Sequence, residues 1–414
     1  MNLIKTSFLS FVATGVKLLS ALVINKFVSI FIGPSGLATI GQLQNFLGII
    51  QVLSQGGINS GVVKYTAENN DPSVRKLLWS NALKITLICS LIISLFLFVF
   101  SGYMSEYVFN TYEFSYVFLI LAFTIVLFSI NQLLLSILNG LKEIKTFISI
   151  NIIQSCYSLV FSTLFIVFLG LDGALIAMVT NQSVILFVIL WKLRNHKLII
   201  IDNFRDEFNA NKSKKLFNYS LMALVTAFTA PVSLMVVRNY IAESISWNAA
   251  GYWQAINYIS SMYLMVITTA LSTYFLPRLS EIENKMELRR ELKKGYFILI
   301  PLVVFLSCVI FFLKDFIIWF LFNDDFKPMR ELFKWQLIGD VFKISSWLVA
   351  YLMLAKAMSK MFIITEVVFS FSFVILSIVC IDYFGIVGAT YAYALNYIVY
   401  MFVIMLLMRK QVFN

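Results

Sequence analysis

The feature that most constrains this chain is a succession of apolar runs, separated by short charged segments or by Gly and Pro. A helix rises 1.5 Å per residue, so about 20 apolar residues cross the ~30 Å hydrocarbon layer of a bilayer. Only helices and closed barrels satisfy their backbone polar groups in lipid, and runs of this length match helices. The sequence therefore predicts an all-α polytopic membrane protein.

Composition agrees with this interpretation. Hydrophobic residues make up 60% of the 414 residues and charged residues 13%, against roughly 25% charged residues in soluble domains. Apolar windows between charged or Gly/Pro breaks predict about twelve transmembrane helices. These spans are 8–31, 38–63, 80–100, 114–137, 146–168, 173–191, 216–238, 249–275, 295–313, 332–355, 361–381 and 386–407.

The distribution of Lys and Arg predicts the orientation, because these residues are retained on the cytoplasmic side of a membrane. If the N-terminus is cytoplasmic, 23 of the 32 Lys and Arg lie in cytoplasmic segments, five on the opposite side and four within spans. We therefore expect both termini in the cytoplasm. The net charge of +11 reflects this bias, which leaves no reason to expect a nucleic-acid partner.

An internal repeat divides the chain. When the sequence is aligned with itself so that Lys145 meets Lys360, the fifth and sixth spans fall on the eleventh and twelfth without a gap. The other matched pairs include Gly170/Gly385, Gly173/Gly388, Asn181/Asn396 and Arg194/Arg409. This predicts two six-helix bundles, 1–191 and 216–414, joined by a cytoplasmic linker, 192–215. Parallel repeats of this kind surround a central cavity and give alternating access by rocking, which indicates a carrier.

Motifs for covalent or hydrolytic catalysis are missing from the sequence. There is no GxxxxGK[ST] motif for nucleotide hydrolysis, and the single histidine, His196, lies in the charged central loop. The four cysteines lie inside apolar runs without metal-ligand spacing. We therefore expect no enzyme activity, no cofactor and no metal.

Cations dominate the ionisable residues within spans. Each such residue costs about 2.5–3.5 kcal/mol on insertion scales, which makes it a functional candidate. A cationic cavity selects an anionic substrate, so the candidate substrate-binding cations are Lys17, Lys26, Arg238 and Lys343. For Lys26 and Arg238, near the outer ends of their spans, snorkelling to the headgroups is the alternative.

Two acids, Asp340 and Glu366, lie within spans and are the candidate residues for ion coupling. Asp340 and Lys343 are three positions apart on one helical face, so a simple structural pair is the alternative for them. The eighth span adds Trp253, which could stack on a sugar, and Gln254. Both are counted as candidate substrate-binding residues, although packing is the other interpretation.

Five segments resemble one known family along essentially the whole chain. They are Ile32–Leu37, Asn59–Tyr65, Phe275–Ser280, Trp335–Lys343 and Ala355–Ala357. These motifs resemble the Wzx-type flippases for undecaprenyl-diphosphate-linked oligosaccharides, in the polysaccharide branch of the MOP exporter superfamily. The resemblance is strongest to the translocases of O-antigen and enterobacterial common antigen. Lys17 and Lys26 fall where those relatives carry lysines.

The resemblance implies a flippase of lipopolysaccharide biosynthesis or a related pathway. Such a protein moves an undecaprenyl-diphosphate-linked oligosaccharide from the cytoplasmic to the periplasmic leaflet of the bacterial inner membrane. It also implies, as partners, membrane lipid and the polysaccharide polymerase and chain-length regulator of the same pathway. Two alternatives stay open: a MATE-like drug/cation antiporter, which should show cavity acids, and a polytopic polysaccharide polymerase, which should carry a long Arg-rich periplasmic loop.

Overall fold

The computed structural model describes residues 3–69, 71–194, 204, 206, 210–356 and 358–409, without the side chains of residues 3–11, 210–223, 273 and 277. Contacts divide the chain into two compact units, each treated by itself below. The first unit is Met1–Ile32 with Gln42–Pro231, and the second is Gly33–Gly41 with Val232–Asn414. Most of the expected linker, 192–215, lies outside the described residues, and the two predicted six-helix halves stay a prediction.

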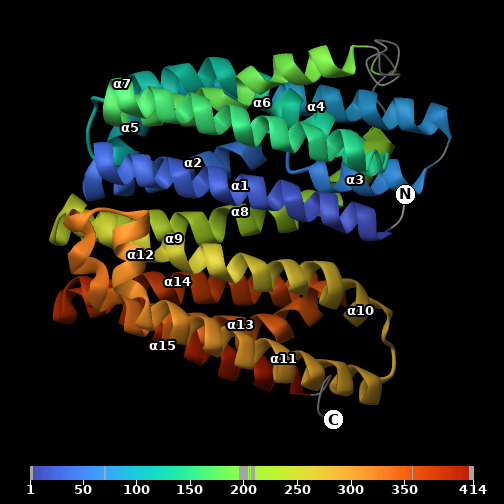
Figure 1. The fold of residues 1–414 in the computed structure, drawn as a ribbon. Helices are drawn as coiled ribbons and strands as arrows, with labels where there is room; N and C mark the ends of the chain where they lie inside the picture. Colours follow the sequence, from blue (N-terminus) through green and yellow to red (C-terminus); the bar gives the residue numbers. More distant parts are fainter. Residues whose placement is uncertain are drawn as a thin grey trace. The chain divides into compact units, whose positions relative to one another are not determined.

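The first unit consists of helices joined by short turns in the part of the chain that the structure describes. In Figure 1, α6 lies between α4 and α7, and α1 packs along α7. A core of Leu, Ile and Trp side chains, including Trp79 and Leu138, joins α3, α4, α6 and α7. The helices are α1 (Leu3–Phe31), most of α2 (Gly33–Ser54), α3 (Asn59–Glu68), α4 (Pro72–Val99), α5 (Ser101–Phe109), α6 (Ser115–Gly140), α7 (Ile144–Leu193) and the first part of α8 (Ala210–Ser244).

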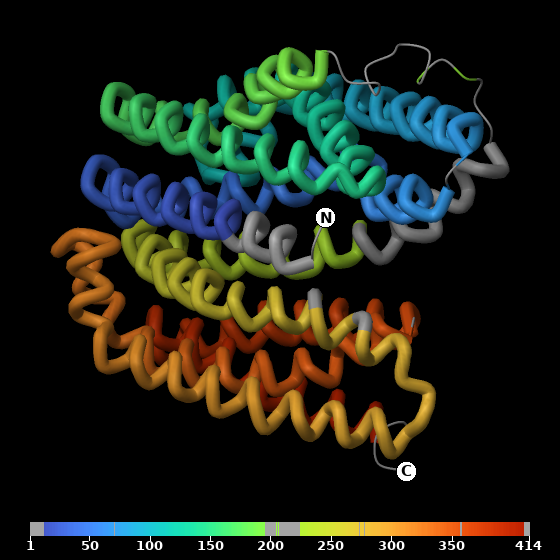
Figure 2. Tube along the Cα trace, turned by 45° about the vertical axis from the view of Figure 1, so that its right-hand side comes forward, coloured from blue at the N-terminus to red at the C-terminus, as the bar shows by residue number. Residues whose placement is uncertain are grey.

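The second unit is organised around α13, which packs against α15 and α11, while α14 packs against α15 (Figure 2). Its core includes Phe326, Phe333 and Leu348, each fully buried. The elements after α8 are α9 (Trp247–Ala270), the π-helical turn η3 (Leu271–Phe275), α10 (Leu276–Glu281), α11 (Lys285–Phe312), α12 (Lys314–Leu321), the 3₁₀ segment η4 (Asp324–Leu332), α13 (Phe333–Ala355), α14 (Ser359–Phe384) and α15 (Ile386–Leu407).

Ten helices in the described part of the chain are long and apolar enough to cross a membrane. One of them, α7, is 50 residues long and contains the fifth and sixth predicted spans on either side of a reversal at Gly170. The eighth predicted span corresponds to α9, which is not among the ten. The chain is therefore an all-α, multi-pass membrane protein, and its helices are consistent with twelve spans.

The two helical hairpins of the sequence repeat turn in the same way. Gly170 has φ +59° and ψ −128°, and Gly385, its counterpart in the repeat, has φ +60° and ψ −148°. This backbone region is open essentially only to glycine. Each reversal folds a helix back on the one before it, and a hydrogen bond from Asn181 to Ser158 joins the two arms of α7.

A second glycine in each hairpin allows the arms to touch. A Cβ on Gly173 would lie 1.9 Å from the carbonyl oxygen of Phe165, and a Cβ on Gly388 would lie 2.0 Å from that of Cys380. Phe165 and Cys380 are themselves counterparts in the same alignment. The sequence repeat therefore corresponds to a repeated close contact of backbones.

One predicted span is wrong in its extent. The sequence predicts a single helix over 38–63, whereas the structure ends α2 at Ser54 and begins α3 at Asn59. Gly56 and Gly57 both have φ +64°, a left-handed conformation that ends a helix. The glycines lie among polar residues between Ser54 and Gly61, so the sequence did carry a signal for the break.

The close contact at Gly173 yields a stability test. Gly173→Ala should lower the free energy of unfolding by about 1–3 kcal/mol, because the added methyl group overlaps a backbone oxygen. Gly48→Ala is the control, since a Cβ there meets nothing within 4 Å. Thermal unfolding of the detergent-purified variants measures the effect. Equal melting temperatures for the two variants would show that the hairpin contact is not tight.

Candidate functional site

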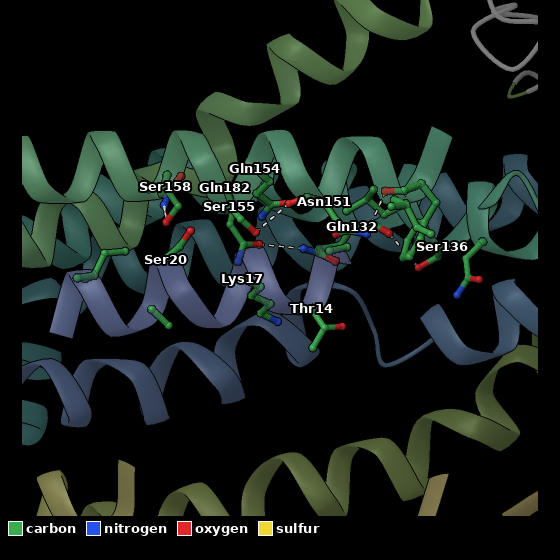
Figure 3. Close-up of a pocket in the computed structure, with 18 of the residues that line it drawn as sticks. Thr14, Lys17, Ser20, Gln132, Ser136, Asn151, Gln154, Ser155, Ser158 and Gln182 are labelled. Atoms are coloured by element: carbon green, nitrogen blue, oxygen red, sulfur yellow. Dashed lines mark hydrogen bonds between the residues drawn. The ribbon is translucent and has the colours of Figure 1, made fainter. Parts of the chain in front are cut away.

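A cavity of about 660 Å³ opens inside the first unit. Figure 3 shows the labelled side chains of α6 and both arms of α7 gathered beside α1, while Thr14 and Lys17 extend from the other side of α1 in this view. The volume is within the ~300–1,000 Å³ range of small-molecule sites. We call this cavity the amide pocket, because six of its lining residues carry side-chain amides: Gln132, Asn139, Asn151, Gln154, Asn181 and Gln182.

The amide pocket is built from polar stripes on helices. The first arm of α7 contributes Asn151, Gln154, Ser155 and Ser158, which follow the i, i+3, i+4, i+7 spacing of one helical face. The lining positions of α6, from Gln132 to Asn139, have the same spacing. Polar stripes within spans face protein or water and not lipid, which places this surface inside the unit.

The described lining of the amide pocket is positively charged through a single residue. Lys17 is exposed and lines the cavity, and among the described side chains of the lining it is the one charged group, with no Asp or Glu. Gln132 donates to Gln182 across the cavity wall at 2.8 Å. Lys26 is half-buried on the same helix and does not line the pocket. The pocket can therefore offer one cation and many paired donors and acceptors to a ligand.

A second polar cluster lies around Asp340 in the second unit. Asp340 is fully buried on α13, and its carboxylate accepts hydrogen bonds from three hydroxyls. Ser260 donates at 2.7 Å, Tyr263 at 2.8 Å and Tyr393 at 2.8 Å. The preceding Gly339 makes room for this arrangement, since a Cβ there would lie 2.4 Å from the Tyr393 ring. The Gly339-Asp340 pair of the sequence motif is thus explained by packing.

Lys343 is not in a direct ion pair with Asp340, as their spacing on the helix had suggested. No contact within 4.0 Å joins their charged atoms among the described residues. Instead its ammonium nitrogen lies over the rings of Trp347, Tyr393 and Tyr397, at 5.0, 5.7 and 5.4 Å from their centroids. The three aromatic faces draw the ammonium away from the carboxylate. Lys343 also interacts electrostatically with Asp340 and with Glu366 of α14, so both candidate coupling acids lie near one cation.

Three other predicted residues come together where α8 meets α9. Arg238 is 1% exposed, donates to the side-chain oxygen of Gln254 at 2.5 Å and lies 5.6 Å over the ring of Trp253. A Cβ on Gly41 would lie 2.5 Å from the Gln254 amide. Arg238 and Trp253 are buried in protein, so the snorkelling alternative for Arg238 does not describe this structure.

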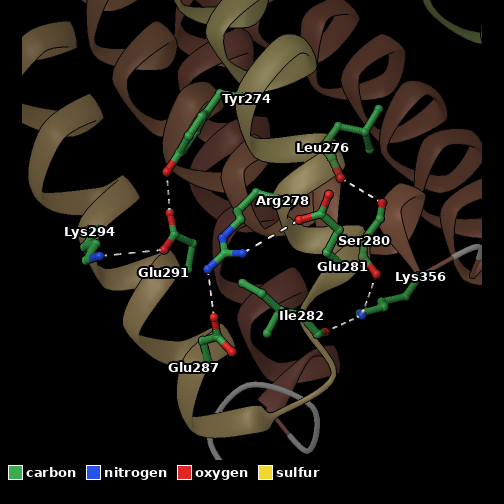
Figure 4. Close-up of polar contacts among 10 residues, drawn as sticks. All are labelled: Tyr274, Leu276, Arg278, Ser280, Glu281, Ile282, Glu287, Glu291, Lys294 and Lys356. Atoms are coloured by element: carbon green, nitrogen blue, oxygen red, sulfur yellow. Dashed lines mark hydrogen bonds and ion pairs between the residues drawn. The ribbon is translucent and has the colours of Figure 1, made fainter.

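Two of the motifs that resemble the family, Phe275–Ser280 and Ala355–Ala357, meet in a polar network that fixes the connection from α10 to α11 (Figure 4). Arg278 pairs with Glu287 at 2.7 Å. Lys356 donates to the backbone carbonyl of Ile282 at 2.6 Å and to that of Ser280 at 3.3 Å. These motif residues position the backbone and are not directed into the amide pocket.

Sequence reasoning missed much of both polar sites. It identified Lys17 and Asp340 because a charge in an apolar span is conspicuous. It did not find the amides around Lys17 or the hydroxyl donors Ser260 and Tyr393. The signal for the amides was present as polar residues at helical spacing. No signal identified the hydroxyl donors, because their distance from Asp340 along the chain is large.

The described residues include no group of three His, Cys, Asp or Glu side chains that could hold a metal ion.

Comparison with known proteins gives two matching family models. A model described as "Polysaccharide biosynthesis protein" matches residues 3–283, and a model described as "Lipid II flippase MurJ" matches residues 203–413. Together they span nearly the whole chain, and the predicted family resemblance is confirmed.

Individual proteins agree with the models. The chain is 28% identical over 401 residues to a protein named lipid III flippase from Escherichia coli (strain K12), covering 97% of this chain and 96% of the relative. The fold is similar to an inward-facing MATE family transporter of the MOP superfamily, with a TM-score of 0.82, 14% identity and coverage of 96% and 94%. It is also similar to inward-closed lipid II flippase MurJ, with a TM-score of 0.75, 16% identity and coverage of 98% and 87%.

The hydroxyl donors around Asp340 can be tested by stability. Tyr393→Phe should lower the free energy of unfolding by about 0.6–2 kcal/mol, the range for hydrogen bonds inside membrane proteins, because Asp340 loses one donor. Tyr391→Phe is the control: its ring packs on Trp335 and its hydroxyl makes no hydrogen bond among the described residues. Thermal unfolding of both purified variants makes the comparison. An unchanged Tyr393→Phe protein would contradict the proposed importance of this bond.

Proposed function

Because the chain belongs to the polysaccharide biosynthesis protein family, we propose that it is a flippase for an undecaprenyl-diphosphate-linked oligosaccharide. It moves this lipid from the cytoplasmic to the periplasmic leaflet of the bacterial inner membrane by alternating access. The observation that supports this function best is the amide pocket, which offers one lysine, no acid and many amides within a membrane-spanning unit.

The chemistry of the pocket suits such a cargo. A diphosphate and a saccharide cannot cross hydrocarbon unaided, because each loses its hydration without replacement. Lys17 supplies a charge-assisted contact for the diphosphate, while amides and hydroxyls replace the water around the sugar. The polyprenyl chain is apolar, so it stays in the bilayer outside the pocket. The names of the relatives, lipid III flippase and lipid II flippase, support the same class of substrate.

The MATE-like alternative has less support. The chain shares its fold with a multidrug transporter, but fold alone does not choose a substrate. A cation antiporter needs an acid that can reach a cationic drug, and the amide pocket has none. Asp340 is buried under three hydroxyl donors in the other unit.

The remaining features of the proposal concern orientation, partners and coupling. Both termini lie in the cytoplasm, as the Lys and Arg bias indicates, and the protein performs no covalent chemistry. The polymerase and chain-length regulator of the same pathway are its proposed partners. Asp340 is engaged with three hydroxyls, so Glu366, half-buried beside Lys343, is the better candidate for an ion-coupling carboxylate.

Deletion of the gene tests the function. The deletion strain should accumulate a polyprenyl-diphosphate-linked oligosaccharide and lose the corresponding surface polysaccharide, since synthesis continues while export stops. Mass spectrometry of extracted lipids and analysis of the cell surface measure the two effects. A normal surface polysaccharide together with normal lipid pools would reject the proposed function.

The same strain tests the role of Lys17. Lys17→Ala should abolish rescue by a plasmid copy, and Lys17→Arg should rescue in part, because it keeps the charge with a different geometry. Lys314→Ala, at a partly exposed lysine of α12 that lies over the ring of Phe311, is the matched control and should rescue fully. Immunoblots of membranes must show equal amounts of the variants. Full rescue by Lys17→Ala would remove Lys17 from the binding site.

A further inference from the structure

The exposed side of α11 changes from basic to apolar within about one turn. Its side chains follow the spacing of one helical face, while the opposite side, which includes Leu288, Leu292 and Leu299, is buried in the second unit. Along the exposed side, four cations are followed by apolar residues. We call this surface the α11 face, and its residues are Met286, Arg289, Arg290, Lys293, Lys294, Phe297 and Ile298.

The apolar part of the α11 face continues along the rest of the helix. Phe297 is 83% exposed and Phe305 is 63% exposed, on a helix that is long and apolar enough to cross a membrane. Lipid chains cover exposed apolar side chains of this kind in a bilayer. The change from Lys294 to Phe297 therefore places the four cations at the depth of the headgroups, where the phosphates of lipids lie.

Acids of the protein leave much of this positive charge unbalanced. Glu287 forms its ion pair with α10, outside the α11 face, and the buried Glu291 lies 3.9 Å from Lys294. No ion pair within 4.0 Å joins Arg290 or Lys293 to an acid in the described part of the chain. Neighbouring cations repel one another, so an anion from outside the protein would stabilise this cluster.

We propose that the α11 face binds an anionic phospholipid of the adjacent leaflet, which is the cytoplasmic leaflet in the orientation proposed above. The phosphate accepts charge-assisted hydrogen bonds from Arg290 and Lys293, and the acyl chains lie along Phe297 and Ile298. Free phosphate has no chain for the apolar part, and a zwitterionic lipid has no net charge for the cations. The α11 face shares no residue with the amide pocket, so its occupant is a membrane phospholipid and not the cargo.

The test places a fluorescent reporter on the α11 face of the full-length protein. Phe297→Trp keeps a large apolar ring next to the cations, and a brominated lipid quenches a tryptophan that it contacts. The chain has seven other tryptophans, so the fluorescence of the protein that keeps Phe297 is subtracted. In phosphatidylcholine vesicles, quenching of the reporter should show that brominated phosphatidylglycerol binds about fivefold more tightly than brominated phosphatidylcholine.

Two double variants of the reporter protein locate the preference. Arg290→Gln with Lys293→Gln should make the two lipids bind about equally, because the phosphate loses its two charged donors. Lys142→Gln with Lys145→Gln is the matched control, since it removes two exposed lysines from another loop that is predicted to be cytoplasmic. The control should keep the fivefold preference for phosphatidylglycerol.

Four outcomes would overturn the proposal. The first is equal quenching of the reporter protein by the two lipids, and the second is an unchanged preference in the Arg290 and Lys293 variant. The third is loss of the preference in the Lys142 and Lys145 control as well, because the effect would then come from the overall charge of the protein. The fourth is stronger displacement of brominated phosphatidylglycerol by undecaprenyl diphosphate than by unbrominated phosphatidylglycerol, which would assign the α11 face to the cargo.

Discussion

The constraint on which this structure depends is that a polar side chain in a bilayer must find its partners inside the protein. Hydrocarbon offers no hydrogen bonds, so an amide, hydroxyl or charge within a span is stabilised when it is paired or faces a water-filled space. Two polar clusters, one around Asp340 and one around Lys17, illustrate this constraint. Around Asp340, three hydroxyls satisfy a buried carboxylate. Around Lys17, polar stripes enclose a cavity and leave the Asn181 oxygen unpaired.

This difference separates polar groups that stabilise the fold from polar groups that can bind a ligand. A fully satisfied cluster stabilises one arrangement of helices, and a ligand would have to displace bonds that already exist. A cavity whose polar side chains lack hydrogen-bond partners is stabilised when a ligand that supplies those partners enters. Lys343 belongs with the structural groups, because the rings of Trp347, Tyr393 and Tyr397 already contact its ammonium group. In the proposed function the first unit binds the cargo, and the Asp340 cluster maintains the packing of α13 against α15.

The fold could be predicted from sequence largely because membrane helices obey local rules. Run length predicted the spans, and the internal repeat matched Gly170 with Gly385, two glycines that adopt the same backbone conformation in the structure. The break at Gly56 was missed although Gly56, Gly57 and the polar residues beside them interrupt the apolar run. A direct Asp340–Lys343 ion pair, the alternative that helix spacing left open, is not found among the described residues. Helix spacing cannot reveal that Tyr393, from a distant helix, bonds to the acid and lies under the lysine. Such contacts depend on tertiary packing, which the linear pattern does not contain.

The central claim is that this protein moves a lipid-linked saccharide between leaflets, and reconstitution tests it most directly. Vesicles are prepared with the purified protein and with the lipid-linked oligosaccharide from the deletion strain, then exposed to an impermeant enzyme that cleaves the saccharide. Vesicles without the protein should protect the inner-leaflet half of the lipid. With the protein, nearly all of the saccharide should become cleavable while the vesicles stay sealed. Protection of half of the lipid in sealed vesicles that contain folded protein would contradict the account.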